Sequence, residues 1–298
     1  MNGLALARAY HDAHHHALLA RYPAQRIAAG LVGFGSECFG FDDALSRDHD
    51  FGPGFCLWLT SADFAAFGSD LQAGYDRLPT PFAGVPARTT TARSGQRVGV
   101  FAIDDFYSQF LGAPELPISA ADWLQIPEEL LATAVNGAVF NDPLGQFSHV
   151  RQSLLAYYPD NLLRRKLASI VAKMAQSGQY NLPRALQRGE LTTALLAQAE
   201  FIRHTCNVAY ILNRRFAPFY KWLHRGLQTL PLLSTLHAAL HQLAQTPLHQ
   251  SAAPVENICA QLLQTLIAQG YTIAGDSFLE SHVDAILHPT LETRHEPH

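Results

Sequence analysis

The pattern of apolar residues changes at about Ser119, and this change limits the possible folds more than any other feature of the chain. Before it, short apolar runs bounded by glycine, such as 27–32, are typical of strands buried on both faces. After it, apolar residues recur at helical spacing and no convincing strand remains. The pattern therefore predicts an α+β chain, with a sheet and flanking helices in a first domain at 1–118 and an all-helical second domain at 119–298.

Individual elements can be placed from the same patterns. In the first domain we expect a helix over 3–21, strands over 27–32 and 48–60, a helix over 61–78, and a hairpin of 88–91 with 97–103. In the second we expect helices at about 119–135, 146–157, 160–177, 189–213, 216–229, 231–245, 254–270 and 276–287. Ser36 is a good N-cap, so a further helix is expected to begin there.

Composition places the chain among globular proteins and argues against two classes of partner. Apolar residues make up 48% of its 298 residues and charged residues 15%, which leaves ample material for a core. The net charge of −4 argues against long nucleic acid, because domains that bind it usually carry a basic excess. No segment offers the roughly 18 uncharged apolar residues of a membrane span, and Arg8 and Asp12 interrupt the region where a signal peptide would be apolar. We therefore expect a cytoplasmic protein without a membrane partner.

Cysteine and histidine give no strong metal signal. The four cysteines form no CxxC pair, so reduced thiols are expected. His11 and the run His14-His15-His16 offer spacings at which ligands can meet on a helix. We interpret them as a solvated helix face, because no carboxylate or second cluster completes a metal-binding set.

Two short motifs suit a site that handles phosphate and metal. Gly35 lets a backbone approach a phosphate closely, and a helix N-terminus at Ser36 would offer N–H donors. Asp48 and Asp50 are spaced i, i+2, which on a strand places both carboxylates on one face. Mg²⁺ is commonly held by one or two carboxylates together with substrate phosphates. The residues alone thus predict a metal–nucleotide site.

A family resemblance rests on the spacing of these motifs. With Gly35-Ser36, eleven intervening residues and then Asp48-His49-Asp50-Phe51, the chain resembles the DNA polymerase β-like nucleotidyltransferase superfamily (kanamycin nucleotidyltransferase-like). More narrowly, it is similar to a bacterial branch known only as a domain of unknown function. The segments that carry this second resemblance are Gly35-Ser36-Glu37, Phe41-Asp42-Asp43, 46–53, 173–181, Asn213-Arg214-Arg215 and 218–222.

The resemblance implies a fold, a cofactor and a substrate class. The fold is a small nucleotidyltransferase-type mixed sheet with flanking helices, followed by the helical domain. Asp48 and Asp50 would be ligands of Mg²⁺ or Mn²⁺. Gly35 and Ser36 would lie beside the phosphates of a nucleoside triphosphate (NTP) such as ATP.

The chain departs from the superfamily at a third carboxylate. Many active members carry it on a later strand, where this chain has Gly99. Asp104 and Asp105 stand at the end of that strand, and Asp104 either reaches the site as a third catalytic carboxylate or caps the next helix. If neither reaches, the chain binds nucleotide without efficient transfer.

The helical domain offers polar and cationic side chains in two clusters. The first is a stripe on one helix face, formed by Lys166, Lys173, Gln176, Ser177 and Tyr180. The second surrounds Pro218 and contains Asn213, Tyr220 and Lys221. On their own such clusters are typical of solvated faces. The resemblance instead favours nucleotide contacts by Lys173, Ser177, Tyr180, Tyr220 and Lys221.

These observations leave three hypotheses. The first is a nucleotidyltransferase that moves an NMP group from a Mg-NTP to a hydroxyl-type acceptor by metal-assisted in-line displacement. The sequence does not identify the acceptor, which could be a small molecule, a protein side chain or an RNA end. The second is a catalytically weak nucleotide-binding or regulatory module, such as one partner of a toxin–antitoxin-like pair. The third, an EF-hand-like calcium loop at 42–50, lacks the ligand spacing and the closing glutamate.

Overall fold

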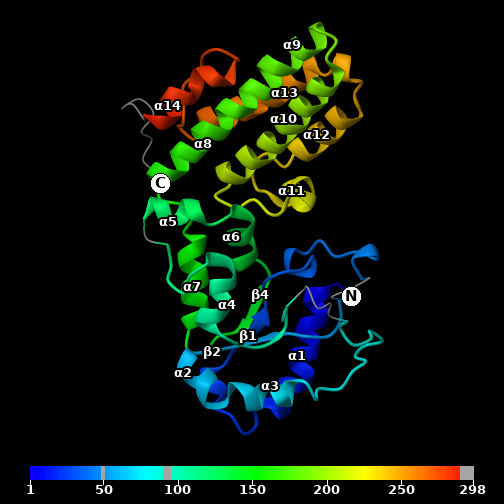
Figure 1. Ribbon diagram of the computed structural model, residues 1–298, viewed down its shortest axis with the longest axis vertical. Helices are drawn as coiled ribbons and strands as arrows, with labels where there is room; N and C mark the ends of the chain where they lie inside the picture. The colour runs from blue at the N-terminus through cyan, green and yellow to red at the C-terminus, as the bar shows by residue number, and fades with distance from the viewer. Residues whose placement is uncertain (48–50, 90–94, 118, 289–298) are drawn as a thin grey trace. The chain divides into compact units, whose positions relative to one another are not determined.

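The computed structural model describes residues 1–47, 51–89, 95–117 and 119–288. The chain divides into two compact units, Met1–Tyr157 and Tyr158–His298 (Figure 1). The fold is α+β, with a small mixed sheet and flanking helices followed by a helical C-terminal region. The division falls 39 residues beyond the boundary expected after residue 118, because a fourth strand and its neighbouring helices belong to the first unit.

Four strands form the sheet of the first unit, in the order β3-β2-β1-β4. β1 pairs antiparallel with both β2 and β4, whereas β2 and β3 run parallel. The bounds are β1 Ala28–Leu31, β2 Cys56–Leu59, β3 Gly99–Ala102 and β4 Ala138–Asn141.

Two sequence-based predictions about strands are wrong. β3 pairs in parallel with β2 instead of forming a hairpin with 88–91, of which the described residues Arg88 and Thr89 belong to no strand. β4 lies beyond Ser119, where no strand was predicted. It is short and only partly buried, so its apolar pattern is too weak to stand out in the sequence.

Helices cover both faces of this sheet. One face carries alternate residues such as Ile27, Phe55 and Leu57, which pack against α1 and α3. On the other face, the ring of Trp58 stacks on Phe147 of α7 with centroids 3.7 Å apart. The helices of this unit are α1 Gly3–Leu19, α2 Ser61–Asp63, α3 Ser69–Tyr75, α4 Ile103–Leu111, α5 Ala120–Gln125, α6 Glu128–Ala134 and α7 Gln146–Leu155. Because both faces are covered, β1, β2 and β3 are buried along their length, which explains their uninterrupted apolar runs.

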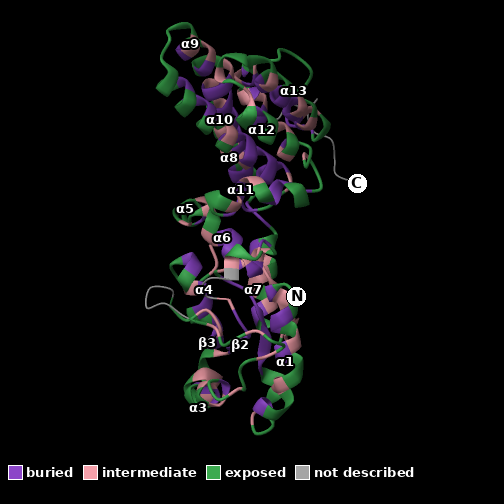
Figure 2. Cartoon of the chain, turned by 90° about the vertical axis from the view of Figure 1, so that its right-hand side faces the viewer, coloured by how far each residue is buried: buried purple, intermediate pink, exposed green. Residues whose placement is uncertain are grey.

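Every regular element in the described part of the second unit is helical. α10 is central and packs against α8, α9 and α11, and Figure 2 shows buried residues along α8 and α10. The helices are α8 Asp160–Met174, α9 Leu182–Gln187, α10 Leu191–Leu212, α11 Tyr220–Gly226, α12 Leu236–Gln245, α13 Ala252–Ala268 and α14 Val283–Leu287. A π-helical segment, η5 (Ala175–Asn181), joins α8 to α9. Across the described residues of both units, none of the helices has the length and apolar character needed to cross a membrane.

Candidate active site

The turn after β1, which carries Gly35 and Ser36, is held at its start by a side chain that the sequence analysis missed. The backbone N–H of Gly33 donates to Oδ1 of Asn136 at 2.9 Å, and Nδ2 of Asn136 donates to the carbonyl oxygen of Gly33 at 2.8 Å. An asparagine side chain carries the same donor and acceptor as a peptide group. Asn136 therefore continues the pairing of β1 and β4 by one step into the turn.

Ser36 does not begin a long helix. It precedes a single 3₁₀ turn, η2 (Glu37–Phe39), and its side chain makes no capping hydrogen bond. Gly40 then adopts the left-handed conformation, and the N–H of Phe41 donates back to the carbonyl oxygen of Ser36 at 2.9 Å. This Schellman-type closure ends the helical turn, so the helix predicted to begin at Ser36 is limited to one turn.

Gly35 occupies a position where no other residue fits well. Its φ of +133° lies in a region that residues with a side chain rarely adopt. A Cβ atom there would also lie 2.5 Å from Oε2 of Glu37. The carboxylate of Glu37 therefore packs directly against the backbone of the Gly35-Ser36 turn.

Arg88 ties this turn to the segment that leads into β2. Its Nη1 atom donates to Oε1 of Glu37 at 3.0 Å, and its Nη2 atom donates to the carbonyl oxygen of Gly52 at 3.0 Å. The side chains of Arg88 and Glu37 are both buried. A planar guanidinium can hold two acceptors at fixed angles, so Arg88 holds Glu37 and Gly52 at a fixed separation.

The two aspartates Asp48 and Asp50 lie outside the described residues. The pairing of the strands nevertheless shows where the segments that precede and follow these aspartates in the sequence lie in the sheet. Gly30 of β1 pairs with Cys56 of β2, and Cys56 pairs with Gly99 of β3. The C-terminal end of β1 and the N-terminal ends of β2 and β3 therefore share one edge of the sheet.

Asp104 lies at the other edge. β3 runs from Gly99 for roughly 10 Å before α4 begins, and Asp104 stands in the first turn of that helix. Its Oδ2 atom accepts a hydrogen bond from Oγ of Ser61 at 2.5 Å. The structure thus does not bring Asp104 to the Gly35-Ser36 turn. Asp104 does not cap α4 either, because the N-cap is Ala102 and no described side chain makes a capping hydrogen bond.

Burial disfavours the thiolate form of two cysteines near the Arg88–Glu37 pair. Burial raises the pKa of the Cys38 thiol well above its ordinary value, and the Glu37 carboxylate adds to this effect. Burial also raises the pKa of Cys56 to about 12. Both thiols are therefore protonated near neutral pH, whereas the thiolate is the reactive form.

The stripe predicted from Lys173 to Tyr180 lies in the second unit and is not continuous, because η5 is π-helical. A π-helix bonds residue i to i+5 and so shifts side chains away from α-helical positions. Lys173 is exposed, but Ser177 is buried, and its hydroxyl donates to the carbonyl oxygen of Lys173 at 2.8 Å. Tyr180 is partly exposed, and its ring lies under the guanidinium of Arg184 at 3.9 Å.

Close packing accounts for the glycine in this segment. A Cβ atom on Gly178 would overlap the ring of Phe201 on α10. Gly178 therefore allows η5 to approach α10 directly.

The second predicted cluster contains two exposed side chains and one structural one. Tyr220 and Lys221 are exposed at the start of α11, and Nζ of Lys221 lies 4.4 Å from the ring centroid of Trp222. The amide of Asn213 instead bridges to Leu232, donating to its carbonyl oxygen at 3.0 Å and accepting from its N–H at 2.8 Å.

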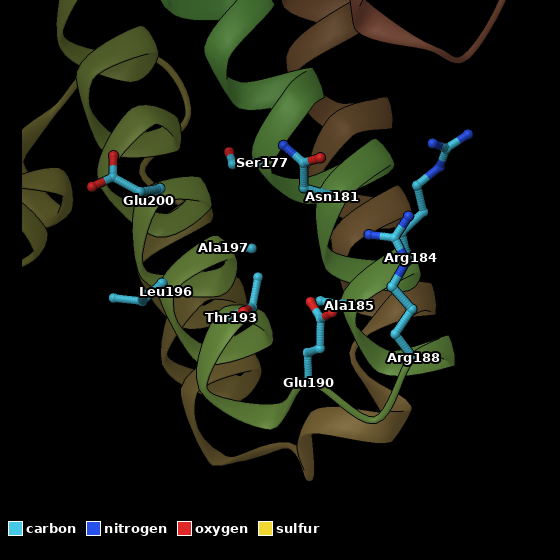
Figure 3. A pocket seen from close by; sticks show the side chains of 10 residues that line it. All are labelled: Ser177, Asn181, Arg184, Ala185, Arg188, Glu190, Thr193, Leu196, Ala197 and Glu200. Carbon is cyan, nitrogen blue, oxygen red and sulfur yellow. The ribbon is translucent and has the colours of Figure 1, made fainter.

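A cavity of 330 Å³ opens between α10 and the η5–α9 segment, and Ser177 lines it. Figure 3 shows Asn181 and Thr193 facing it from opposite helices, with the carboxylate of Glu190 pointing into the space between them. Charged residues of both signs contribute to its lining: Arg184, Arg188, Glu190 and Glu200. The cavity therefore suits a ligand that carries both donors and acceptors.

One family model matches part of the chain. It is described as "Domain of unknown function (DUF4037)" and covers residues 123–223. The matched range includes Asn136, η5 and α10, whereas the Gly35-Ser36 turn precedes it. The chain matches no curated protein and no solved structure. The match carries no activity with it, so the nucleotidyltransferase resemblance rests on the motifs alone.

Proposed function

We propose that this chain is a nucleotidyltransferase that moves an NMP group from a Mg-NTP to a hydroxyl-type acceptor. In this proposal Asp48 and Asp50 hold the metal, and the Gly35-Ser36 turn receives the phosphates. Two observations support this function: the sequence resemblance, and the arrangement of the described residues at one edge of the sheet.

The bridge made by Arg88 is the observation that supports the proposal most. Glu37 directly follows the phosphate-binding turn, and Gly52 lies two residues beyond Asp50. Arg88 hydrogen-bonds to both. A metal–nucleotide site needs its phosphate-binding backbone and its metal ligands at a fixed separation, and a buried guanidinium between the two segments supplies such a constraint.

The reaction requires the protein mainly to bind the metal and the nucleotide and to stabilise the charge on the phosphates. Two aspartates and the phosphates form the oxygen-rich ligand set that Mg²⁺ prefers, and the metal, when bound, neutralises charge on the phosphates. The acceptor hydroxyl attacks the α-phosphorus and forms a new P–O bond. The bond to the β-phosphate oxygen breaks, pyrophosphate leaves, and the hydroxyl proton passes to solvent. Backbone N–H groups of the turn can stabilise the phosphate charge.

Transfer of label from an NTP tests the proposal. The full chain is incubated with Mg²⁺, α-phosphate-labelled ATP and three acceptor pools: aminoglycosides, extract proteins and short RNA. We expect label in one pool with the wild type and none with the Asp48→Asn/Asp50→Asn double variant. Asp105→Asn, which removes an exposed carboxylate from the first turn of α4, serves as the matched control and retains activity. Full labelling of an acceptor by the double variant would contradict the mechanism.

A second candidate, a nucleotide-binding module with weak turnover, is favoured by one observation. The β3 residue at the relevant edge is Gly99, and Asp104 stands at the far end of the strand. No residue of β3 therefore supplies a third carboxylate at this edge. This candidate predicts Mg-dependent ATP binding by calorimetry together with no labelling of any pool.

A further inference from the structure

Three neighbouring side chains on α1 bring metal-ligating atoms together outside the proposed active site. One ligand atom each from His11, Asp12 and His15 lies within 4.8 Å of the other two. His15 lies four positions after His11 and three after Asp12, spacings at which helix residues are surface neighbours, and the Asp12 carboxylate meets His11 through a 2.9 Å contact. The sequence predicted a solvated helix face here, but His11 is only 5% exposed. Asp12 supplies the carboxylate that the histidines lacked.

Hydrogen bonds orient the two imidazoles. The Nδ1 atom of His15 lies 3.0 Å from the carbonyl oxygen of His11. A carbonyl only accepts, so Nδ1 of His15 carries the proton and Nε2 keeps its lone pair. The Nδ1 atom of His11 lies 2.9 Å from Oδ1 of Asp12, and the two imidazole rings stack with centroids 4.3 Å apart. The carbonyl partner of His15 is of the kind that fixes the orientation of a metal-binding histidine.

The surroundings of His11 favour a neutral, immobile ring. Phe55 meets it edge-on at 5.2 Å, and Phe140 lies 5.3 Å away. A metal ligand must be a neutral imidazole, and an apolar surrounding such as these two rings suits the neutral form. Asp12 is exposed on the same face, so its carboxylate can rotate towards a shared ion.

We propose that His11, Asp12 and His15 form a binding site for a divalent transition-metal cation of the Zn²⁺ class. Two imidazoles and one carboxylate suit Zn²⁺ and leave a fourth position for water. Mg²⁺, which prefers oxygen ligands, does not suit this set. With metal bonds of about 2.0–2.1 Å, the ligand atoms would lie roughly 3.3 Å apart, so binding requires the Asp12 carboxylate and the His15 ring to rotate. The ion takes the place of the proton on Nδ1 of His11, and that proton moves to Nε2.

Calorimetric titration with Zn²⁺ tests this site. The full chain carries Asp48→Asn/Asp50→Asn, so that the proposed nucleotide site does not contribute, and is freed of metal with a chelator. We expect one Zn²⁺ per chain. His15→Ala and Asp12→Asn should each weaken binding by at least about tenfold, a loss that even an outer-shell partner typically causes. His16→Ala removes an exposed histidine that is no ligand in the proposal, although its ring lies 3.9 Å from that of His15; it should keep one Zn²⁺ per chain and weaken binding far less than His15→Ala.

Folding of each variant is checked by circular dichroism and by its melting temperature without metal. Asp12 is exposed, so Asp12→Asn keeps the test decisive if His15→Ala fails to fold. Zn²⁺ should raise the melting temperature of the parent and of His16→Ala more than that of Asp12→Asn at the same free Zn²⁺ concentration. Unchanged affinity in Asp12→Asn, or an equal loss in His16→Ala, would overturn the proposal. Because Asp48 and Asp50 are already replaced, neither result depends on the nucleotidyltransferase proposal.

Discussion

Arg88 and Glu37 form an ion pair in which Nη1 and Oε1 lie 3.0 Å apart and the two side chains are 7% and 5% exposed. Such a pair contributes little net stability compared with an apolar pair of similar size, but removing one partner leaves a buried charge. Arg88 also donates to the carbonyl oxygen of Gly52. We therefore attribute to the pair a positioning role between the Gly35-Ser36 turn and the entry to β2.

Two variants can separate the contribution of this ion pair to stability from its positioning role. Glu37→Gln removes the carboxylate that pairs with the buried Arg88 cation, and we expect it to lower the free energy of unfolding by about 3–5 kcal/mol. Glu37→Leu/Arg88→Met removes both charges and should recover most of that loss, yet still weaken Mg-ATP binding by about tenfold. Urea denaturation and calorimetry measure the two effects. Tight Mg-ATP binding by the folded double variant would show that the bridge positions nothing.

Gly35 and Gly40 provide a matched pair of glycines in one turn. Alanine at Gly40 is strained by about 1–2 kcal/mol, because that residue is left-handed. At Gly35, whose φ of +133° lies outside the left-handed α region, the strain is about 1–3 kcal/mol. At Gly40 a Cβ meets nothing within 4 Å, whereas at Gly35 it overlaps the Glu37 carboxylate. We expect Gly35→Ala to cost about 1–3 kcal/mol more than Gly40→Ala in urea denaturation, and to be the one that weakens Mg-ATP binding. Equal losses in the two variants would contradict this account of the turn.

Asp104 should be dispensable for nucleotide binding. It stands at the edge of the sheet away from Gly35 and is engaged by Ser61. Asp104→Asn removes a favourable charge at the start of α4, so we expect a stability loss of about 0.3–1 kcal/mol and an unchanged dissociation constant for Mg-ATP by calorimetry. A tenfold weaker complex would place Asp104 in the site after all.

Acid should destabilise the protein partly through His204. Burial lowers its pKa, the nearby cation of Arg203 lowers it further, and Glu200 opposes them. Nδ1 of His204 is buried, and among the residues that the structure describes it has no hydrogen-bond partner. The unfolded chain binds the proton at a pKa of about 6.5, whereas the folded chain binds it only at lower pH. Stability is therefore full above that value and falls as the pH drops through it.

Urea denaturation at pH 7.5, 6.5 and 5.5 measures this effect. His204→Gln should flatten the pH dependence without abolishing it, because burial also lowers the pKa of His11 and His237. An identical slope in the variant would exclude His204 as a contributor.

Much of this fold is predictable from local pattern. The helix at Gly3–Leu19 and the strand at Ala28–Leu31 follow from apolar periodicity and a bounded apolar run. β4 does not, because a short edge strand that is half exposed has no distinctive pattern. The parallel pairing of β3 with β2 is not predictable from local pattern either. A turn signal between two apolar runs favours a hairpin, and only long-range packing decides against it.

The residues of the candidate site are likewise only partly predictable from the sequence. Gly35 and Ser36 stand out by residue type and spacing. Arg88 and Asn136 do not, because each acts on a segment far away in the chain, 51 residues from Glu37 and 103 residues from Gly33 respectively. The segment η5 is π-helical and packs on α10 through Gly178, and α-helical spacing therefore misplaced Ser177 on an exposed stripe.

Metal-dependent nucleotide binding is the most direct test of the central claim. The wild type and the Asp48→Asn/Asp50→Asn double variant are titrated with a non-hydrolysable ATP analogue, with and without Mg²⁺, in a calorimeter. We predict that the wild type binds one analogue per chain only when Mg²⁺ is present, and that the double variant, folded by circular dichroism, does not bind it. Equal binding by the two proteins, or binding that ignores Mg²⁺, would contradict a metal–nucleotide site at Asp48 and Asp50.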